Sequence, residues 1–122
     1  MIKKVIPFAH NKLKEIVTQD DYVIDGTCGN GFDTLFLARL ARKVYAFDVQ
    51  DLAIENTKDR IKRNKLFNVK LIKDSHANLD KYVEEPIKAA MFNLGYLPGS
   101  DKRVVTKSDS TIEAIKKTQE RL

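Results

Sequence analysis

Residues 23–31 decide the fold: Val23-Ile24-Asp25-Gly26-Thr27-Cys28-Gly29-Asn30-Gly31, an apolar run that ends in an acid and passes into a glycine-rich turn. A strongly helix-forming stretch follows at residues 33–41. This order predicts a buried strand, a tight turn and a helix that begins at the turn. Glycine permits a positive φ and lets a ligand approach the main chain, and the first N–H groups of a helix are free to bind a polar or anionic group. The stretch therefore indicates a βα unit with a ligand site at the carboxyl end of its strand.

The rest of the chain repeats this alternation of short apolar runs and helical patterns. We expect strands at 22–25, 43–48, 69–73 and 87–92, helices at 7–17, 33–41, 51–66 and 110–122, a short helical turn at 77–83 and a polar loop before the last helix. Such alternation is typical of βαβ units around a parallel sheet. The sequence therefore predicts an α/β, Rossmann-like fold, a parallel sheet flanked by helices, in a single domain over residues 1–122.

The carboxyl side of this fold is expected to be incomplete, because a series of βα units would continue with another strand after the last helix. The fold is then truncated after the fourth strand and its following helix. Such a chain exposes the apolar edge of that strand, which favours pairing with a partner. We therefore expect a homodimer or another association that covers the edge.

The composition bounds the class of protein. The 122 residues are 43% hydrophobic and 32% charged, enough for a packed core, and the net charge of +5 permits a polyanionic partner. No apolar run approaches the roughly 20 residues of a membrane span, and the lone Cys28 and the absence of a His/Cys cluster exclude an internal disulfide and a typical metal site. We expect a cytoplasmic protein without a membrane or metal partner. The cation-rich residues 58–65 are more typical of a solvated helix face than of contact with nucleic-acid phosphates.

The glycine spacing separates two classes of nucleotide-binding site. The turn has the pattern G-x-x-G-x-G at residues 26–31, whereas the dinucleotide fingerprint is G-x-G-x-x-G. An acid at the strand end followed by G-x-G resembles the Rossmann-like methyltransferases that depend on S-adenosyl-L-methionine. In that class the acid, here Asp25, faces the methionine amino group, and the glycines make room for the nucleoside. The alternative is a tight turn with only a structural role.

The next two strands also end in polar residues. Asp48 is placed to accept hydrogen bonds from both ribose hydroxyls, with Gln50 close to the adenosine, and the alternative is that Asp48 only caps the following helix. Asp74, Ser75 and His76 would border the adenine at the end of the third strand, and the alternative is a turn that caps a helix. Because ligands of open α/β sheets bind at the carboxyl ends of the strands, we expect these positions to form one site.

The fourth strand ends in Asn93-Leu94-Gly95-Tyr96-Leu97-Pro98, which resembles the Asn/Asp-Pro-Pro-aromatic motif of amino-directed methyltransferases, with Leu94 and Gly95 in place of the prolines. A protonated amine, with a pKa of about 10, has no lone pair to donate. Asn93 would accept its hydrogens and direct the nitrogen, and Tyr96 would pack on a uracil ring or near the cation. The alternative is an ordinary exit from a strand. His10 in the first helix is a weaker candidate for the same site, and Cys28 is expected to be a small buried filler rather than a nucleophile.

Two long stretches together are similar to one bacterial methyltransferase family, labelled “putative rRNA methylases”. They are Asp25-Gly26-Thr27-Cys28-Gly29-Asn30-Gly31-Phe32-Asp33-Thr34-Leu35-Phe36-Leu37-Ala38 and Phe92-Asn93-Leu94-Gly95-Tyr96-Leu97-Pro98-Gly99, followed by Val105-Thr106-Lys107. The family commonly has Ala where Gly26 stands, and its members continue with further strands of the sheet.

The resemblance implies a transferase of tRNA modification that converts 5-aminomethyl-(2-thio)uridine at the wobble position to its 5-methylaminomethyl form. It implies S-adenosyl-L-methionine as the cofactor and the anticodon stem-loop of tRNA as the partner. The target base would face Asn93, Tyr96 and His10. The residues expected to line the cofactor site are Asp25, Thr27, Gly29, Asn30, Gly31, Asp33, Thr34, Asp48, Gln50, Asp74, Ser75 and His76.

Three other functions stay open at this point. The methyl acceptor is alternatively ribosomal RNA, a protein or a small amine, because only the resemblance selects tRNA. The chain is alternatively a non-catalytic module that binds the cofactor or RNA, which the expected truncation favours. A nicotinamide-dependent oxidoreductase is disfavoured by the glycine spacing.

Overall fold

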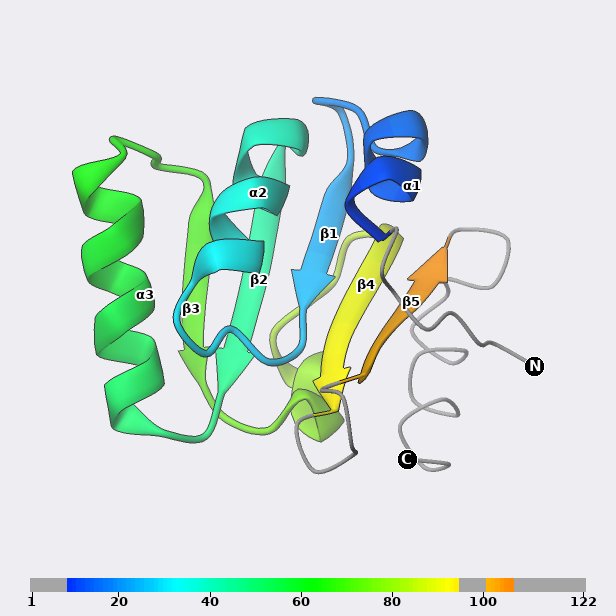
Figure 1. Ribbon diagram of the computed structural model, residues 1–122. Helices are drawn as coiled ribbons and strands as arrows, with labels where there is room; N and C mark the ends of the chain where they lie inside the picture. Colours follow the sequence, from blue (N-terminus) through cyan, green and yellow to red (C-terminus); the bar gives the residue numbers. More distant parts are fainter. Residues whose placement is uncertain (1–8, 95–100, 107–122) are drawn as a thin grey trace.

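The protein is an alternating series of helices and strands (Figure 1). The computed structural model describes the backbone of residues 9–94 and 101–106 and the side chains of residues 10–92. In chain order the elements are α1 (Ala9–Ile16), β1 (Tyr22–Asp25), α2 (Phe32–Leu40), β2 (Lys43–Asp48), α3 (Asp51–Arg63), β3 (Val69–Lys73), the 3₁₀ helix η1 (His76–Lys81), β4 (Ile87–Leu94) and β5 (Asp101–Thr106).

The strands form one sheet in the order β3-β2-β1-β4-β5. β1 is parallel to β2 on one side and to β4 on the other, β2 is parallel to β3, and β5 is antiparallel to β4. The carboxyl ends of the four parallel strands therefore meet at one edge of the sheet, the lower edge in Figure 1. The Rossmann-like α/β fold expected from the sequence is confirmed, and the chain reverses direction of winding between β1 and β4.

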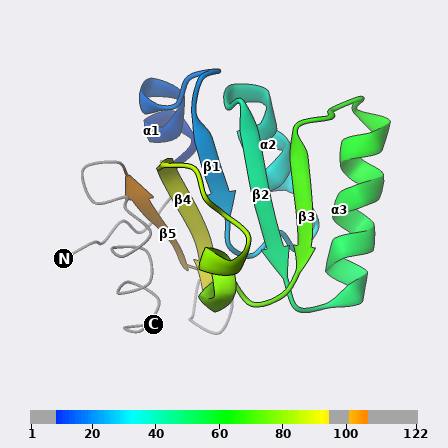
Figure 2. The same cartoon turned by 180° about the vertical axis from the view of Figure 1, so that it is seen from behind.

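Helices cover the two faces of the sheet unequally. Figures 1 and 2 show α1, α2 and α3 on one face and η1 on the other, near the carboxyl ends of the strands. Successive side chains along each strand point to opposite faces of the sheet and pack against the helices there. Val23 and Val44 pack with α1 and α2, whereas Ile24 and Tyr45 pack with Leu79 of η1. Two apolar clusters thus fix the sheet between its helices.

β5 corrects two expectations. The polar loop expected after residue 99 contains a strand, which pairs with β4 from Ala89↔Thr106 to Leu94↔Asp101. The edge of β4 is therefore covered by β5, so the expectation that this edge is open is wrong for the part of the chain that the structure describes. The expected association with a partner stays a prediction. The β-branched run Val104-Val105-Thr106 suits a strand, and the preceding charges obscured it.

The other boundaries differ by a few residues. The turn expected at 77–83 is the 3₁₀ helix η1, the third helix ends at Arg63 rather than at 66, and β4 extends to Leu94. The expected helix at 110–122 and the first residues of the expected helix at 7–17 lie outside the described residues. None of the described helices is long and apolar enough to cross a lipid bilayer.

Candidate cofactor and substrate site

Asp25 ends β1 as a buried carboxylate, with 1% of the residue exposed. Its Oδ1 accepts the main-chain N–H of Thr27 at 3.1 Å, and its Oδ2 accepts the hydroxyl of Thr34 at 2.6 Å. Thr34 is itself fully buried in the first turn of α2. Asp25 therefore fastens the end of the central strand to the start of the helix, and it sets the path of the turn between them.

Two glycines of the turn have left-handed backbone conformations, with φ of 50° at Gly29 and 87° at Gly31. A Cβ on Gly31 would lie 2.9 Å from the Cα of Thr57, so only glycine lets α3 pack this close. A Cβ on Gly29 would meet nothing within 4 Å. The main chain at Gly29 is therefore open on the side where a side chain would stand, as a backbone that receives a ligand must be.

Gly26 lies at the point where three strand ends converge. A Cβ on Gly26 would lie 2.4 Å from Cδ1 of Phe92 on β4 and 3.3 Å from Cδ2 of His76, which follows β3. The rings of His76 and Phe92 pack edge to face with centroids 4.9 Å apart. An alanine at this position, common in the family that the sequence resembles, therefore requires the Phe92 ring to move.

Asp48, at the end of β2, joins the second strand to the same turn. Its Oδ2 accepts the N–H of Gly29 at 3.1 Å and its Oδ1 accepts the N–H of Gln50 at 3.0 Å. The N-cap of α3 is Gln50, whose side chain makes no cap hydrogen bond. The alternative in which Asp48 is only the helix cap is therefore wrong, because its carboxylate instead holds the glycine turn.

The residues after β3 divide between two roles. The Asp74 carboxylate accepts hydrogen bonds from Asn78, the Tyr82 hydroxyl and the N–H of Ser75, and these bonds hold the pKa of Asp74 below its ordinary value. The Ser75 hydroxyl accepts the N–H of Ala77 and caps η1. Asp74 and Ser75 thus stabilise their own turn, whereas His76 is the residue of this group that the structure places beside Gly26.

α3 holds the turn through residues that the sequence did not single out. Thr57 donates its hydroxyl to the carbonyl of Gly29 at 3.1 Å, and Arg60 donates Nε to the carbonyl of Asn30 at 2.8 Å. The Arg60 guanidinium also lies 3.7 Å from the ring centroid of Phe32, a cation–π contact. Thr57 and Arg60 are three residues apart on one helix face, which is the only signal in the sequence that could have pointed to them.

His10 of α1 reaches the first turn of α2. Its Nε2 lies 2.9 Å from Oδ1 of Asp33, and its ring stacks on Phe36 with centroids 3.8 Å apart and an interplanar angle of 8°. The contact brings together His10, which was expected to face the target base, and Asp33, which was expected to line the cofactor site. His10 is therefore placed next to the glycine turn and kept there by both a polar and an aromatic contact.

Asn93, one of the expected substrate residues, lies near the end of β4. The backbone of Asn93 pairs with Lys102 of β5, two positions beyond Met91, which pairs with Asp25. Asn93 thus belongs to the same edge of the sheet as Asp25 and Asp48. Tyr96 lies outside the described residues.

Cys28 is buried among apolar residues within the turn, as expected of a filler. Burial raises the pKa of its thiol to about 12, so the nucleophilic thiolate is scarce at neutral pH. Within the described ranges, no three His, Cys, Asp or Glu side chains are grouped so that they could hold a metal ion.

Two solved structures that resemble this chain in both fold and sequence are described as a putative methyltransferase and a putative rRNA methylase. The chain is 46% identical to a protein from Streptococcus mutans described as a putative methyltransferase in complex with SAH, with a TM-score of 0.75, covering 100% of this chain and 68% of that one. It is also 46% identical to a protein from Clostridium thermocellum described as a putative rRNA methylase, with a TM-score of 0.72, covering 82% of this chain and 58% of that one. The class of protein defined by fold and site is thus the Rossmann-like methyltransferases.

The family follows from the sequence match. Residues 44–122, more than half of the chain, match the family model described as “Putative rRNA methylase”, and the chain belongs to this family. It is 37% identical over 128 aligned residues to the chloroplastic tRNA (mnm(5)s(2)U34)-methyltransferase of Arabidopsis thaliana. That alignment covers 93% of this chain and 47% of the plant protein, so the chain spans about half the length of this relative.

Proposed function

We propose that the chain binds S-adenosyl-L-methionine and methylates the exocyclic amine of 5-aminomethyl-(2-thio)uridine at the wobble position of tRNA. The observation that carries the proposal is the junction of Asp25, the open turn at Gly29 and Asp48 at one edge of the sheet. The complex of the Streptococcus mutans relative with SAH (S-adenosylhomocysteine) supports S-adenosyl-L-methionine as the cofactor. The name of the plant relative supports the wobble uridine of tRNA as the methyl acceptor.

The residues at this edge fit the proposed cofactor. Asp48 is partly exposed and each of its oxygens accepts one N–H, which leaves lone pairs for the two ribose hydroxyls. The open backbone at Gly29 leaves room for the nucleoside. Asp25, Thr27, Asn30, Gly31, Asp33 and Thr34 would surround the methionine end, and Gln50, Ser75 and His76 the adenine, with Asp74 holding their turn.

Positioning supplies most of the catalysis in this proposal. S-adenosyl-L-methionine brings an already activated methyl group, so the chain's residues need to orient the amine and remove its proton. The Asn93 amide oxygen would accept an N–H of the amine and point its lone pair at the methyl carbon, with Tyr96 against the base. The protonated amine must give up a proton before it has a lone pair to offer, and His10 beside Asp33 would be the candidate acceptor of that proton.

Labelled methyl transfer into bulk tRNA that carries the 5-aminomethyl group without its methyl, and into rRNA, tests the proposal. We expect label in tRNA, and enzymatic digestion to nucleosides should recover it as 5-methylaminomethyl-(2-thio)uridine. Asp48→Ala should weaken SAH binding at least tenfold by calorimetry, since hydrogen bonds to a charged group contribute about 1.5–3 kcal/mol. Asp48→Asn, which keeps one acceptor oxygen, should fall between Ala and the wild type.

Asn93 separates substrate orientation from cofactor binding. Asn93→Ala should lower turnover far more than SAH affinity, and Asn93→Asp, which keeps the acceptor, should retain part of the activity. If Asn93→Ala lost turnover and SAH affinity equally, Asn93 would not be the residue that orients the acceptor amine.

Ribosomal RNA is a second candidate acceptor because the family description names it. If label were found in rRNA but not in tRNA, rRNA would become the proposed methyl acceptor in place of the wobble uridine. The proposed cofactor site would stay the same.

A further inference from the structure

An exposed aromatic ring marks the end of the sheet opposite to the site described above. Phe67, in the loop between α3 and β3, has 93% of its surface exposed, more than the other exposed large apolar residues that the structure describes. The loop is nevertheless anchored, because Nδ2 of the adjacent Asn68 donates to the carbonyls of Ala38 and Ala41 at 2.8 and 3.0 Å. The ring is therefore held outward by a fixed loop.

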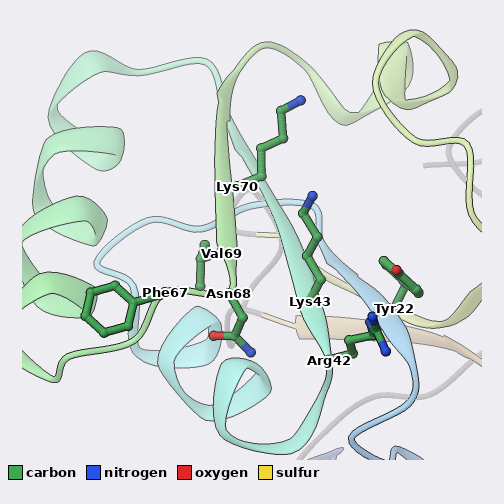
Figure 3. A pocket seen from close by; sticks show the side chains of 7 residues that line it. All are labelled: Tyr22, Arg42, Lys43, Phe67, Asn68, Val69 and Lys70. Carbon is green, nitrogen blue, oxygen red and sulfur yellow. The ribbon is translucent and has the colours of Figure 1, made fainter.

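Cations from four parts of the chain line two hollows next to this ring, and Figure 3 shows three of them, Arg42, Lys43 and Lys70. Two adjoining hollows share Arg42, Phe67 and Asn68; Lys43 and Lys70 line one of them, and Arg39 and Lys65 line the other. We call Phe67 with these five cations the Phe67 surface. No carboxylate lines either hollow, and none of the five cations forms an ion pair with a carboxylate in the described part of the chain.

Concentrated positive charge around one exposed ring has the chemistry of a single-stranded nucleic-acid site. Lysine and arginine neutralise phosphates, and an aromatic ring stacks on an unpaired base whatever its sequence. A protein partner would instead bury a continuous apolar patch at the centre of its interface. Here one ring stands among cations, which favours RNA over an acidic protein.

We propose that the Phe67 surface binds an unpaired segment of the RNA substrate, with the ring stacked on a base and the cations on the flanking phosphates. This inference rests on the proposed RNA substrate. The six residues of β2 separate the two ends of the sheet by about 20 Å, so one folded RNA can contact both ends while a single nucleotide cannot. The surface therefore provides affinity for the RNA away from the reacting base.

Binding of the full chain to an unmodified tRNA transcript, to heparin and to SAH tests the inference. Arg42→Gln with Lys70→Gln should weaken tRNA binding about tenfold and lower the slope of log K against log salt by about two. Phe67→Ala and Phe67→Leu should each weaken tRNA binding severalfold, because both lose the stacking ring. SAH affinity should stay unchanged in all of them.

The controls separate charge, stacking and fold. Lys12→Gln with Lys14→Gln removes two exposed cations from α1 and should leave tRNA affinity near that of the wild type. The Phe67 variants should keep their affinity for heparin, a polyanion without bases, whereas the Arg42/Lys70 variant should lose it.

Three results would overturn the inference: wild-type tRNA affinity in the Arg42/Lys70 variant, wild-type affinity in Phe67→Leu, or no RNA binding by the wild type. The first two, if methyl transfer to RNA persists, leave the proposed function standing. RNA binding that depends on the Phe67 surface without any methyl transfer supports the surface and counts against the proposed function.

Discussion

At the scale of single residues, the contact between Gly26 and Phe92 joins the strand that begins the site to the strand that ends it. The missing Cβ of Gly26 leaves the space that the Phe92 ring fills, and His76 packs edge to face with that ring and also lies beside Gly26. A change at any of these three positions is therefore transmitted to the glycine turn, which follows Gly26 directly.

Gly26→Ala should destabilise the protein by about 1–3 kcal/mol, since an added methyl group forces the buried Phe92 ring out of place. Phe92→Leu makes room, so the double variant should be more stable than the sum of the two single effects by about 1 kcal/mol. Urea denaturation of the four proteins measures this coupling. Strict additivity would show that the ring does not limit the size of residue 26.

The Cys28 thiol should react with Ellman's reagent only after unfolding. At pH 8 a thiol with a pKa raised to about 12 holds on the order of a thousandfold less thiolate than a free cysteine. The same shift makes the native state lose stability as pH rises above about 8.5, because the unfolded thiol gives up its proton first. Cys28→Ala should abolish this alkaline component in urea titrations, and fast labelling of the native protein at pH 8 would contradict the burial.

Residues that follow strands could be predicted as candidates for the site from the sequence, whereas Thr57 and Arg60, which contact the turn from α3, could not. Asp25 and Asp48 stand at strand ends, so topology alone brings them to one edge. Thr57 and Arg60 bind the turn from one face of α3. The residues next to them in the sequence do not indicate that their partners lie nearly thirty positions earlier in the chain.

At the scale of elements, the loop between α3 and β3 is fastened by one side chain. Asn68 supplies donors to the carbonyls of Ala38 and Ala41 at the carboxyl end of α2, which the helix itself leaves without partners. The same loop carries Phe67. The position of the ring on the surface therefore depends on the contact between this loop and the carboxyl end of α2 rather than on the ring itself.

Asn68→Ala should lower the free energy of unfolding by about 1–3 kcal/mol, because two carbonyls lose their donors. Asn64→Ala is the matched control: Asn64 is exposed and bonds within its own helix and to Arg39, and its loss should cost about 0.5 kcal/mol or less. Urea denaturation compares the two. Equal effects would mean that the loop is not anchored through Asn68.

Strands whose position is determined by buried apolar residues were predicted well from the sequence. A strand whose conformation depends on pairing with its neighbour was predicted poorly. β1 and β2 have the expected bounds because their apolar runs are buried in the middle of a parallel sheet. β3 also has the expected bounds, although it is an edge strand in which only Ile72 is buried. β5 was missed because half of its residues are charged, and its strand conformation comes from the ladder with β4 rather than from hydrophobic pattern.

At the scale of the whole molecule, the site needs the ends of strands from both halves of the sheet. The turn after β1 is held by β2 and α3 on one side and by Phe92 of β4 on the other. Occupation of the edge by a ligand should therefore stabilise the entire sheet rather than one loop.

SAH should raise the melting temperature of the full chain by several degrees, since a ligand at a hundred times its Kd adds about 2.7 kcal/mol to the free energy of unfolding. NAD at the same concentration should leave it unchanged, because the glycine spacing differs from that of dinucleotide sites. Thermal denaturation followed by circular dichroism measures both. A larger shift with NAD would restore the oxidoreductase interpretation.

The sheet order has a consequence for how the chain acquires its structure. β1 lies between β2 and β4 in the sheet. During synthesis β2 becomes available to pair with β1 soon after β1 itself, whereas β4 becomes available only once Ile87, which pairs with Tyr22, has been made. A nascent chain that has emerged only as far as β3 presents an unsatisfied row of amides along its most apolar strand. Closing that row is a contact between distant parts of the polypeptide, the kind that slows folding and leaves intermediates open to aggregation, so assembly of the ribosome-bound chain should wait for its fourth strand.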